Sequence, residues 1–218
     1  MTTLIAAPLS RAMRDGTRRE HRAAEGSRFM TALLAGRVDH AGYAAYLRRL
    51  RTVYASIETT GRANSADPWV VAVLDPALER LDALDADLDF WSPGPVTEVD
   101  SPVADLYALR VRDSAAWGGL FVAHHYTRYL GDLSGGQAIA RTLARTFDLE
   151  PQGEGLAFHA FPGIPQPRRY KEAYRARLDH LGLETGARSR VVAEVQHAFG
   201  LNRALLAELD AALTPARG

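Results

Sequence analysis

The stretch Tyr126-Thr-Arg-Tyr-Leu-Gly-Asp-Leu-Ser-Gly-Gly136 places three glycines in a segment whose apolar residues otherwise follow a helical period. Each glycine destabilises a helix by roughly 1 kcal/mol relative to alanine, in a domain whose total stability is about 5–15 kcal/mol. Glycine has no Cβ, so a helix can bend there and a flat ligand can approach its backbone. Gly131 and Gly135 share one face, with Asp132 beside it. That face is a candidate floor for a planar ligand, although a helix crossing packed on small residues would have the same pattern.

A second pattern lies near the N-terminus, where Arg14, Arg18, His21 and Glu25 are spaced four, three and four residues apart. This spacing places them on one stripe of a helix. The Glu25 carboxylate can reach one nitrogen of His21, which leaves the other nitrogen free to bind a metal. A single histidine suits heme iron, whereas a zinc site needs three or four protein ligands. The arginines suit carboxylates at the edge of a ligand. An exposed helix with a His/Glu pair is the alternative interpretation.

Composition limits the class of protein. The chain has 218 residues, of which 47% are hydrophobic, and this length is typical of one domain with a sizeable core. A formal net charge of zero makes nucleic acid an unexpected partner. There is no cysteine, which excludes disulfides, thiolate ligation of iron and a cysteine nucleophile.

Helix-forming residues and the positions of glycine and proline predict an all-α fold without internal repeats or an interdomain linker. Asp39 is the expected N-cap of a long helix that contains Tyr43, Tyr46, Leu47, Leu50, Tyr54 and Ile57. A break is expected at Ser92-Pro-Gly-Pro95, and a loop from 153 to 167. The other helices are expected at 9–25, 27–35, 68–74, 75–84, 101–112, 114–147 (interrupted by the glycines), 167–181 and 184–213.

The sequence resembles the heme oxygenase family from about residue 9 to residue 210. The resemblance rests on several separated segments, of which the one from Tyr126 to Gly136 is the most specific. These are Glu20-His21-Arg-Ala-Ala-Glu25, Phe90-Trp91, Ala123 to Gln137, Gly153-Glu-Gly-Leu-Ala-Phe158, Phe161-Pro162, Tyr170 to Arg177, and Ala198-Phe-Gly-Leu-Asn202.

The resemblance implies a single all-α domain spanning residues 1–218, with its core at about 9–213. Heme b would lie between a proximal helix and a glycine-kinked distal helix, as both substrate and oxygen-activating cofactor. The implied reaction is oxidative cleavage of heme at a meso carbon to biliverdin, CO and Fe²⁺. It uses O2 and electrons from a redox partner, without a flavin or another metal.

The resemblance also implies residue roles. His21 is the expected axial ligand of the heme iron, hydrogen-bonded towards Glu25. Gly131 and Gly135 are expected to bring the distal helix close to the other heme face, so that bound dioxygen tilts towards one meso carbon. Asp132 is expected to order a water chain that delivers protons to the oxygen. Tyr54 and Arg128 are candidate members of that network.

The heme propionates need cationic partners. By match to the family these are Arg14, Arg18, Lys171 and Arg175, with Tyr126 as a hydroxyl donor, while Phe199 and Asn202 lie near the pocket. Where many family members have lysines this chain has arginines, and the loop before Lys171 is Ile164-Pro-Gln-Pro-Arg168. Cleavage at the α meso carbon is therefore an expectation from the resemblance alone.

Two other classes of function compete with this interpretation. A non-catalytic heme carrier or sensor would keep His21 and the basic edge but would not need Asp132 between glycines. A helical enzyme without heme is the other class. A thiaminase-like hydrolase usually employs a cysteine, which is absent, and a di-iron oxidase needs several carboxylate and histidine ligands from facing helices.

The expected electron donor is a ferredoxin or flavodoxin with its reductase, docked on Arg11, Arg18, Arg19 and Arg22. No apolar run approaches the roughly 20 residues of a membrane span. The N-terminus lacks a signal-peptide pattern, and no hydrophobic tail follows the last helix. We therefore expect a monomeric cytoplasmic enzyme of bacterial type, bound neither to a membrane nor to nucleic acid.

Overall fold

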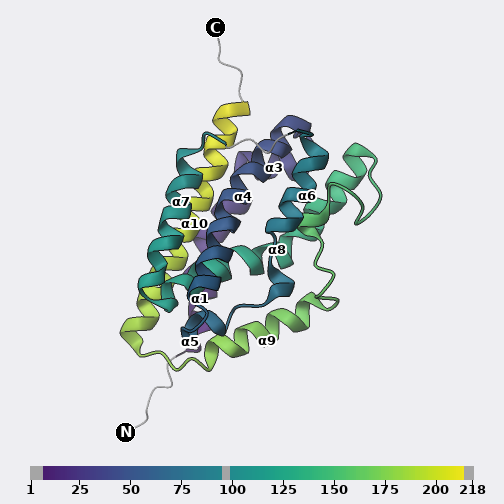
Figure 1. The fold of residues 1–218 in the computed structure, drawn as a ribbon. Helices are drawn as coiled ribbons and strands as arrows, with labels where there is room; N and C mark the ends of the chain where they lie inside the picture. Colours follow the sequence, from purple (N-terminus) through teal and green to yellow (C-terminus); the bar gives the residue numbers. More distant parts are fainter. Residues whose placement is uncertain (1–6, 95–98, 214–218) are drawn as a thin grey trace.

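The computed structural model describes residues 7–94 and 99–213, and all regular elements within these ranges are helical (Figure 1). The predicted all-α fold is confirmed. The α-helices are α1 (Leu9–Gly16), α2 (Arg18–Glu25), α3 (Arg28–Leu34), α4 (His40–Ala63), α5 (Pro68–Val71), α6 (Leu81–Trp91), α7 (Pro102–Asp113), α8 (Gly118–Phe147), α9 (Pro167–Asp179) and α10 (Thr185–Leu213). Three 3₁₀ helices join them, at Pro76–Leu78 (η1), Ser114–Ala116 (η2) and Ala157–His159 (η3).

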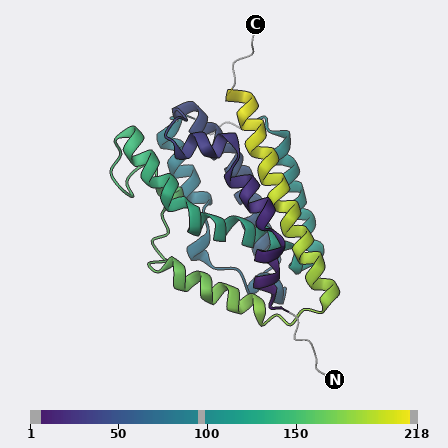
Figure 2. The ribbon, with the colours of Figure 1, turned by 180° about the vertical axis from the view of Figure 1, so that it is seen from behind.

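Helix α4 is the centre of the core. The Asp39 side chain accepts a hydrogen bond from the Gly42 N–H at 2.8 Å, which confirms the predicted N-cap. All six predicted apolar positions of α4 are buried. This helix packs against α6 and α7, while α10 packs against α7 and α8. Figure 2 shows the N-terminal helices running beside α10, which α1, α2 and α3 all contact.

The prediction of one continuous helix from 9 to 25 is wrong, because the helix stops at Gly16 and restarts at Arg18. The carbonyl of Gly16 accepts a hydrogen bond from Gln196 Nε2 of α10 at 2.9 Å instead of continuing a helical ladder. A Cβ on Gly16 would lie 2.7 Å from Val192 Cγ1, so glycine permits this close approach to α10. The break thus comes from a contact with a distant helix.

The glycines of the distal segment do not interrupt α8, contrary to the expectation of a broken helix. The helix is assigned without a gap from Gly118 to Phe147, and Figure 1 shows that it bends along its length. Its start is later than the predicted residue 114, because η2 occupies Ser114–Ala116. It ends at Phe147, and the next residue, Asp148, caps it with a left-handed φ of 52°.

The predicted helix from 75 to 84 is also wrong. Only a 3₁₀ turn, capped by Asp75, follows at Pro76–Leu78, and α6 then begins at Leu81. Helix α6 ends at Trp91, so the predicted break begins at Ser92 as expected, whereas Pro95 lies outside the described residues. Among the described helices, none is long and apolar enough to cross a membrane.

Candidate functional site

A cavity of about 650 Å³ lies between α2 and α8, with further wall residues from α1, α3, α4, α9 and α10. This volume is in the range of small-molecule and cofactor sites. All predicted site residues except Tyr54 and Lys171 line the cavity. Those that do are Arg14, Arg18, His21, Glu25, Tyr126, Arg128, Gly131, Asp132, Gly135, Arg175, Phe199 and Asn202.

Helix α2 supplies one wall of this cavity, which we call the proximal wall. His21 Nδ1 lies 3.2 Å from Glu25 Oε2, one helical turn away. The imidazole ring is half exposed and meets the ring of Phe199 edge-on, with 5.7 Å between centroids. No described residue hydrogen-bonds Nε2. The geometry fits an axial ligand whose orientation is set by a carboxylate on its other nitrogen.

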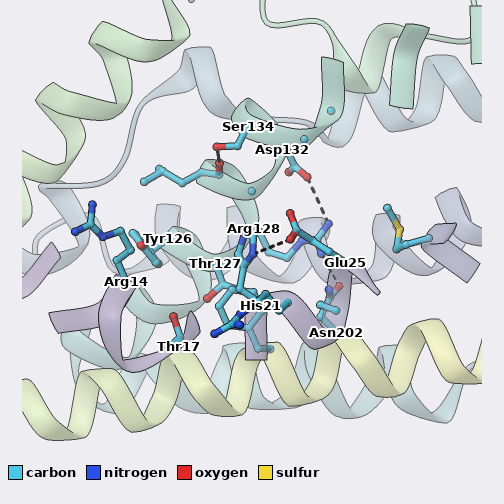
Figure 3. Close-up of a pocket in the computed structure, with 18 of the residues that line it drawn as sticks. Arg14, Thr17, His21, Glu25, Tyr126, Thr127, Arg128, Asp132, Ser134 and Asn202 are labelled. Carbon is cyan, nitrogen blue, oxygen red and sulfur yellow. Dashed lines mark hydrogen bonds and ion pairs between the residues drawn. The ribbon is translucent and has the colours of Figure 1, made fainter. Parts of the chain in front are cut away.

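Helix α8 supplies the opposite, distal wall, and Figure 3 shows His21 and Asp132 on opposite sides of the cavity. A Cβ built on Gly131 or Gly135 would meet nothing within 4 Å, so both positions adjoin open space. Gly136 differs, because a Cβ there would lie 3.1 Å from the Nδ1 of buried His159. Gly131 and Gly135 leave room for a flat ligand against the backbone, whereas Gly136 allows the His159 side chain to pack close to the helix.

Asp132 belongs to a buried polar network behind the distal wall. The Tyr54 hydroxyl donates to Asp132, and Arg128 Nε donates to the Tyr54 oxygen at 3.2 Å. Arg128 also donates to Asn202 Oδ1 at 2.7 Å and lies 3.7 Å from Asp132 Oδ1. Burial raises the pKa of the Asp132 carboxyl, although the charge of Arg128 and the Tyr54 hydrogen bond oppose that shift. Tyr54 therefore reaches the cavity only through Asp132 and Arg128, which both line it.

The cationic edge is formed by Arg14, Arg18 and Arg175, all of which line the cavity. Lys171 stands apart from them. Its Nζ donates to the Oγ of Ser134 at 2.9 Å, which connects α9 to the distal wall. Ser134 is itself a wall residue, so Lys171 lies one contact away from the cavity.

Sequence reasoning missed several wall residues, of which Tyr46 is the most informative. It is buried on α4 and lines the cavity, and the charge of Arg128 acts on its hydroxyl. Tyr46 precedes Tyr54 by eight residues, close to two helical turns, so both belong to the same face of α4. That spacing was visible in the sequence. Other missed wall residues are Thr17, Arg22, Ala24, Met30, Thr127, Leu130, Ser134, Gly136, Ile139 and Leu206.

The sequence and the fold that forms this cavity match a known protein family. The family model described as heme oxygenase matches residues 7–208. The chain belongs to the heme oxygenase family. It is 37% identical to human heme oxygenase 1, over 94% of this chain and 73% of that protein.

Solved structures of the family agree with the fold. Heme oxygenase-1 from Synechocystis, in complex with heme, superposes with a TM-score of 0.89 at 31% identity, over 95% of this chain and 94% of that one. Heme oxygenase-2 from the same organism, in complex with heme and NO, gives 0.90 at 33% identity, over 97% and 89%. The resemblance inferred from the sequence motifs is therefore confirmed.

Family membership argues against the helical enzymes without heme. In addition, residues 7–94 and 99–213 contain no group of three or more His, Cys, Asp or Glu side chains placed to hold a metal ion.

Proposed function

We propose that this protein binds heme b between α2 and α8 and cleaves it oxidatively to biliverdin, CO and Fe²⁺. The observation that carries the proposal is one cavity with His21 on one wall and Gly131, Asp132 and Gly135 on the other. Heme degradation is the activity of the family to which the chain belongs. When bound, heme supplies the iron at which dioxygen is activated and the meso carbons that are oxidised.

On the proximal wall, His21 would bind the heme iron through Nε2. Glu25 Oε2 lies 3.2 Å from Nδ1, and a carboxylate at this position favours the tautomer in which Nε2 carries the free electron pair. Phe199 contacts the imidazole edge-on and restricts its rotation. These contacts orient the ligand towards the distal wall.

On the distal wall, Gly131 and Gly135 let the α8 backbone approach one face of the ring, and this contact restricts the space beside the iron. Asp132 holds an ordered water chain and passes protons along it. A carboxyl pKa above its ordinary value, caused by burial, makes proton transfer near neutral pH easier. Tyr54 and Arg128 hold that carboxylate in place through their hydrogen bonds and charge.

At the cavity edge, Arg14, Arg18 and Arg175 bind the two propionates, with Tyr126 as a hydroxyl donor. Lys171 joins them by exchanging its hydrogen bond to Ser134 for a propionate oxygen. Guanidinium groups suit this task because they bind carboxylates in a bidentate manner. These propionate contacts would fix the rotational orientation of the heme in the cavity. We propose that this orientation directs oxygen to the α meso carbon.

Electrons come from a ferredoxin or flavodoxin with its reductase, with O2 as the oxidant. The exposed arginines of α1 and α2, which are Arg11, Arg18, Arg19 and Arg22, provide a surface that complements an acidic partner. We propose that the enzyme acts as a cytoplasmic monomer without nucleic-acid or membrane partners, and without a flavin or a second metal of its own.

A hemin titration followed by reduction in air tests this function. The wild-type protein should bind one equivalent of hemin with a histidine-ligated spectrum, and a ferredoxin system should then convert it to a bilin, with CO released. The His21→Ala variant should lose that spectrum, and added imidazole should restore it. A stable heme complex that forms no bilin would instead identify a heme carrier.

A further inference from the structure

Asp15, in the last turn of α1, is surrounded by arginines. Its Oδ1 lies 2.7 Å from a guanidinium nitrogen of Arg18 and 3.3 Å from Nε of Arg14, and its Oδ2 lies 3.4 Å from Nε of Arg11. Arg14 and Arg18 line the cavity, but Asp15 does not. One carboxylate therefore contacts two of the three arginines with which α1 and α2 line the cavity.

The position of Asp15 is unfavourable by helix rules, since a negative charge near a helix C-terminus opposes the macrodipole. Its contacts with arginines compensate for that. Partial burial acts to raise the pKa of the Asp15 carboxyl, but hydrogen bonds and charge from Arg18 and Arg14 outweigh it and hold the pKa below its ordinary value. The group is thus an anion at neutral pH.

Arg175 shows a different environment on the same cavity. It lines the wall from α9, and within the described residues no carboxylate pairs with it. The cationic edge therefore has two parts. In one part Asp15 already engages the guanidinium groups of Arg14 and Arg18, and in the other part the charge of Arg175 is unshared.

We propose that Asp15 competes with the heme propionates for Arg14 and Arg18, and so sets how tightly that edge of the ring is held. The inference rests on the proposed propionate contacts of these two arginines. A carboxylate on the protein and a carboxylate on the ligand compete for the same guanidinium donors, so each weakens the contact that the other makes. Asp15 thereby limits the affinity for heme and for any tetrapyrrole that keeps both propionates.

The test is hemin binding by Asp15→Asn, which removes the charge and keeps the shape. Removing one exposed charge near the ligand should tighten binding roughly three- to tenfold at low ionic strength. The gain should appear mainly as slower dissociation, and it should fade at about 1 M salt, where the screening length is roughly 3 Å. Asp15→Glu should bind as the wild type does. Equilibrium titration and stopped-flow dissociation measure these effects without turnover.

Two controls isolate the mechanism. Asp85→Asn makes the same change of net charge at a carboxylate that pairs with Arg51, outside the cavity, and should leave hemin affinity unchanged. Hemin dimethyl ester has no propionate charge, so the difference between Asp15→Asn and wild type should vanish with this probe.

The outcomes separate the inference from the function on which it rests. If Arg18→Ala weakens hemin binding but Asp15→Asn leaves it equal or weaker, the propionate site stands and the competition is wrong. Weaker binding would mean that Asp15 prearranges the arginines. If Arg14→Ala and Arg18→Ala both leave hemin affinity unchanged, the proposed propionate contacts are wrong, and the role of Asp15 is wrong with them.

Discussion

The two walls of the cavity are built in different ways. The proximal wall is an eight-residue helix in which only Ala24 is buried, and it is bordered by exposed ion pairs. The distal wall is a thirty-residue helix with a buried network of Tyr54, Arg128 and Asp132 behind it. Exposed ion pairs contribute about 0–1 kcal/mol each, whereas breaking a buried pair costs about 3–5 kcal/mol. The wall that we propose binds the heme iron is weakly held, and the wall that we propose positions a proton donor is strongly held.

The largest expected effect comes from Arg128→Met, which breaks the distal network. The change leaves Asp132 buried without its cation, and the free energy of unfolding at pH 8 should fall by about 3–5 kcal/mol. Chemical denaturation measures this loss.

The loss should also depend on pH. The pKa of Asp132 is already raised by burial, and without Arg128 it should rise further. For a group whose pKa is higher in the folded state, stability falls as the pH rises through that value. The variant should therefore recover part of its stability at pH 5. An equal loss at both pH values would contradict the buried pair.

The contacts of Glu194 hold the distal helix α8 against its neighbours. Its carboxylate accepts from Arg110 Nε and contacts His124 Nε2, each at 2.8 Å, and so joins α10 to α7 and α8. Burial acts to raise the pKa of Glu194, but His124 and Arg110 outweigh it and lower the pKa from 4.5 to about 2. Stability from this group is present above pH 4.5 and is lost as the pH falls towards 2.

Glu194→Gln should therefore lower the free energy of unfolding by about 2–3 kcal/mol at pH 7. The difference in the free energy of unfolding between wild type and variant should decrease as the pH falls from 4.5 to 2. Urea denaturation across that range measures it. A constant difference would show that the ion pairs do not contribute.

A pair of glycine variants separates the two faces of the distal helix. Gly136→Ala places a methyl group 3.1 Å from His159, and overpacking should lower stability by about 1–2 kcal/mol after the gain in helix propensity. Gly135→Ala adds its methyl group in open space, so thermal unfolding should show equal or higher stability, by at most about 1 kcal/mol.

The order should be reversed for hemin affinity, which a hemin titration measures. Gly135→Ala should weaken hemin binding more than Gly136→Ala does, because its methyl group occupies space beside the ring. If both variants lost stability alike, the distinction between the two faces would be wrong.

The smallest expected effect is on the proximal side. Gln196→Ala removes the hydrogen bond to the Gly16 carbonyl and should lower stability by only about 1 kcal/mol. Hydrogen exchange should nevertheless increase at the amides of α1 and α2, while the amides of α8 stay protected. Uniform exchange over both walls would contradict the contrast between them.

Local signals in the sequence were sufficient for much of the fold. The Asp39 cap depends on residues a few positions away, and the apolar period of α4 gave its buried face correctly. The break at Gly16 could not be predicted, because Gln196 and Val192, which cause it, are 180 and 176 residues away in the chain. The continuity of α8 was likewise hidden, since glycine propensity alone argued for an interruption.

For the site, the family motifs named about half of the residues that line the cavity, and helical spacing accounts for only part of that agreement. The stripe from Arg14 to Glu25 was expected on a single helix, yet its residues lie on two helices that both face the cavity. Lys171 was expected to contact a propionate. Its observed contact with Ser134 depends on how α9 packs near α8, which the sequence does not show. No sequence pattern indicated a role for Asp15, because its ion pairs depend on the side-chain conformations of Arg11, Arg14 and Arg18.

We propose that the proximal wall binds the heme iron while the distal wall controls the chemistry. A single-turnover reaction of the Asp132→Asn hemin complex, followed optically beside the wild type, tests it most directly. We expect the same histidine-ligated starting spectrum and hemin affinity in both proteins, with bilin formation slowed at least about a hundredfold in the variant. Bilin formation at the wild-type rate, or loss of the starting spectrum, would contradict the separation of roles.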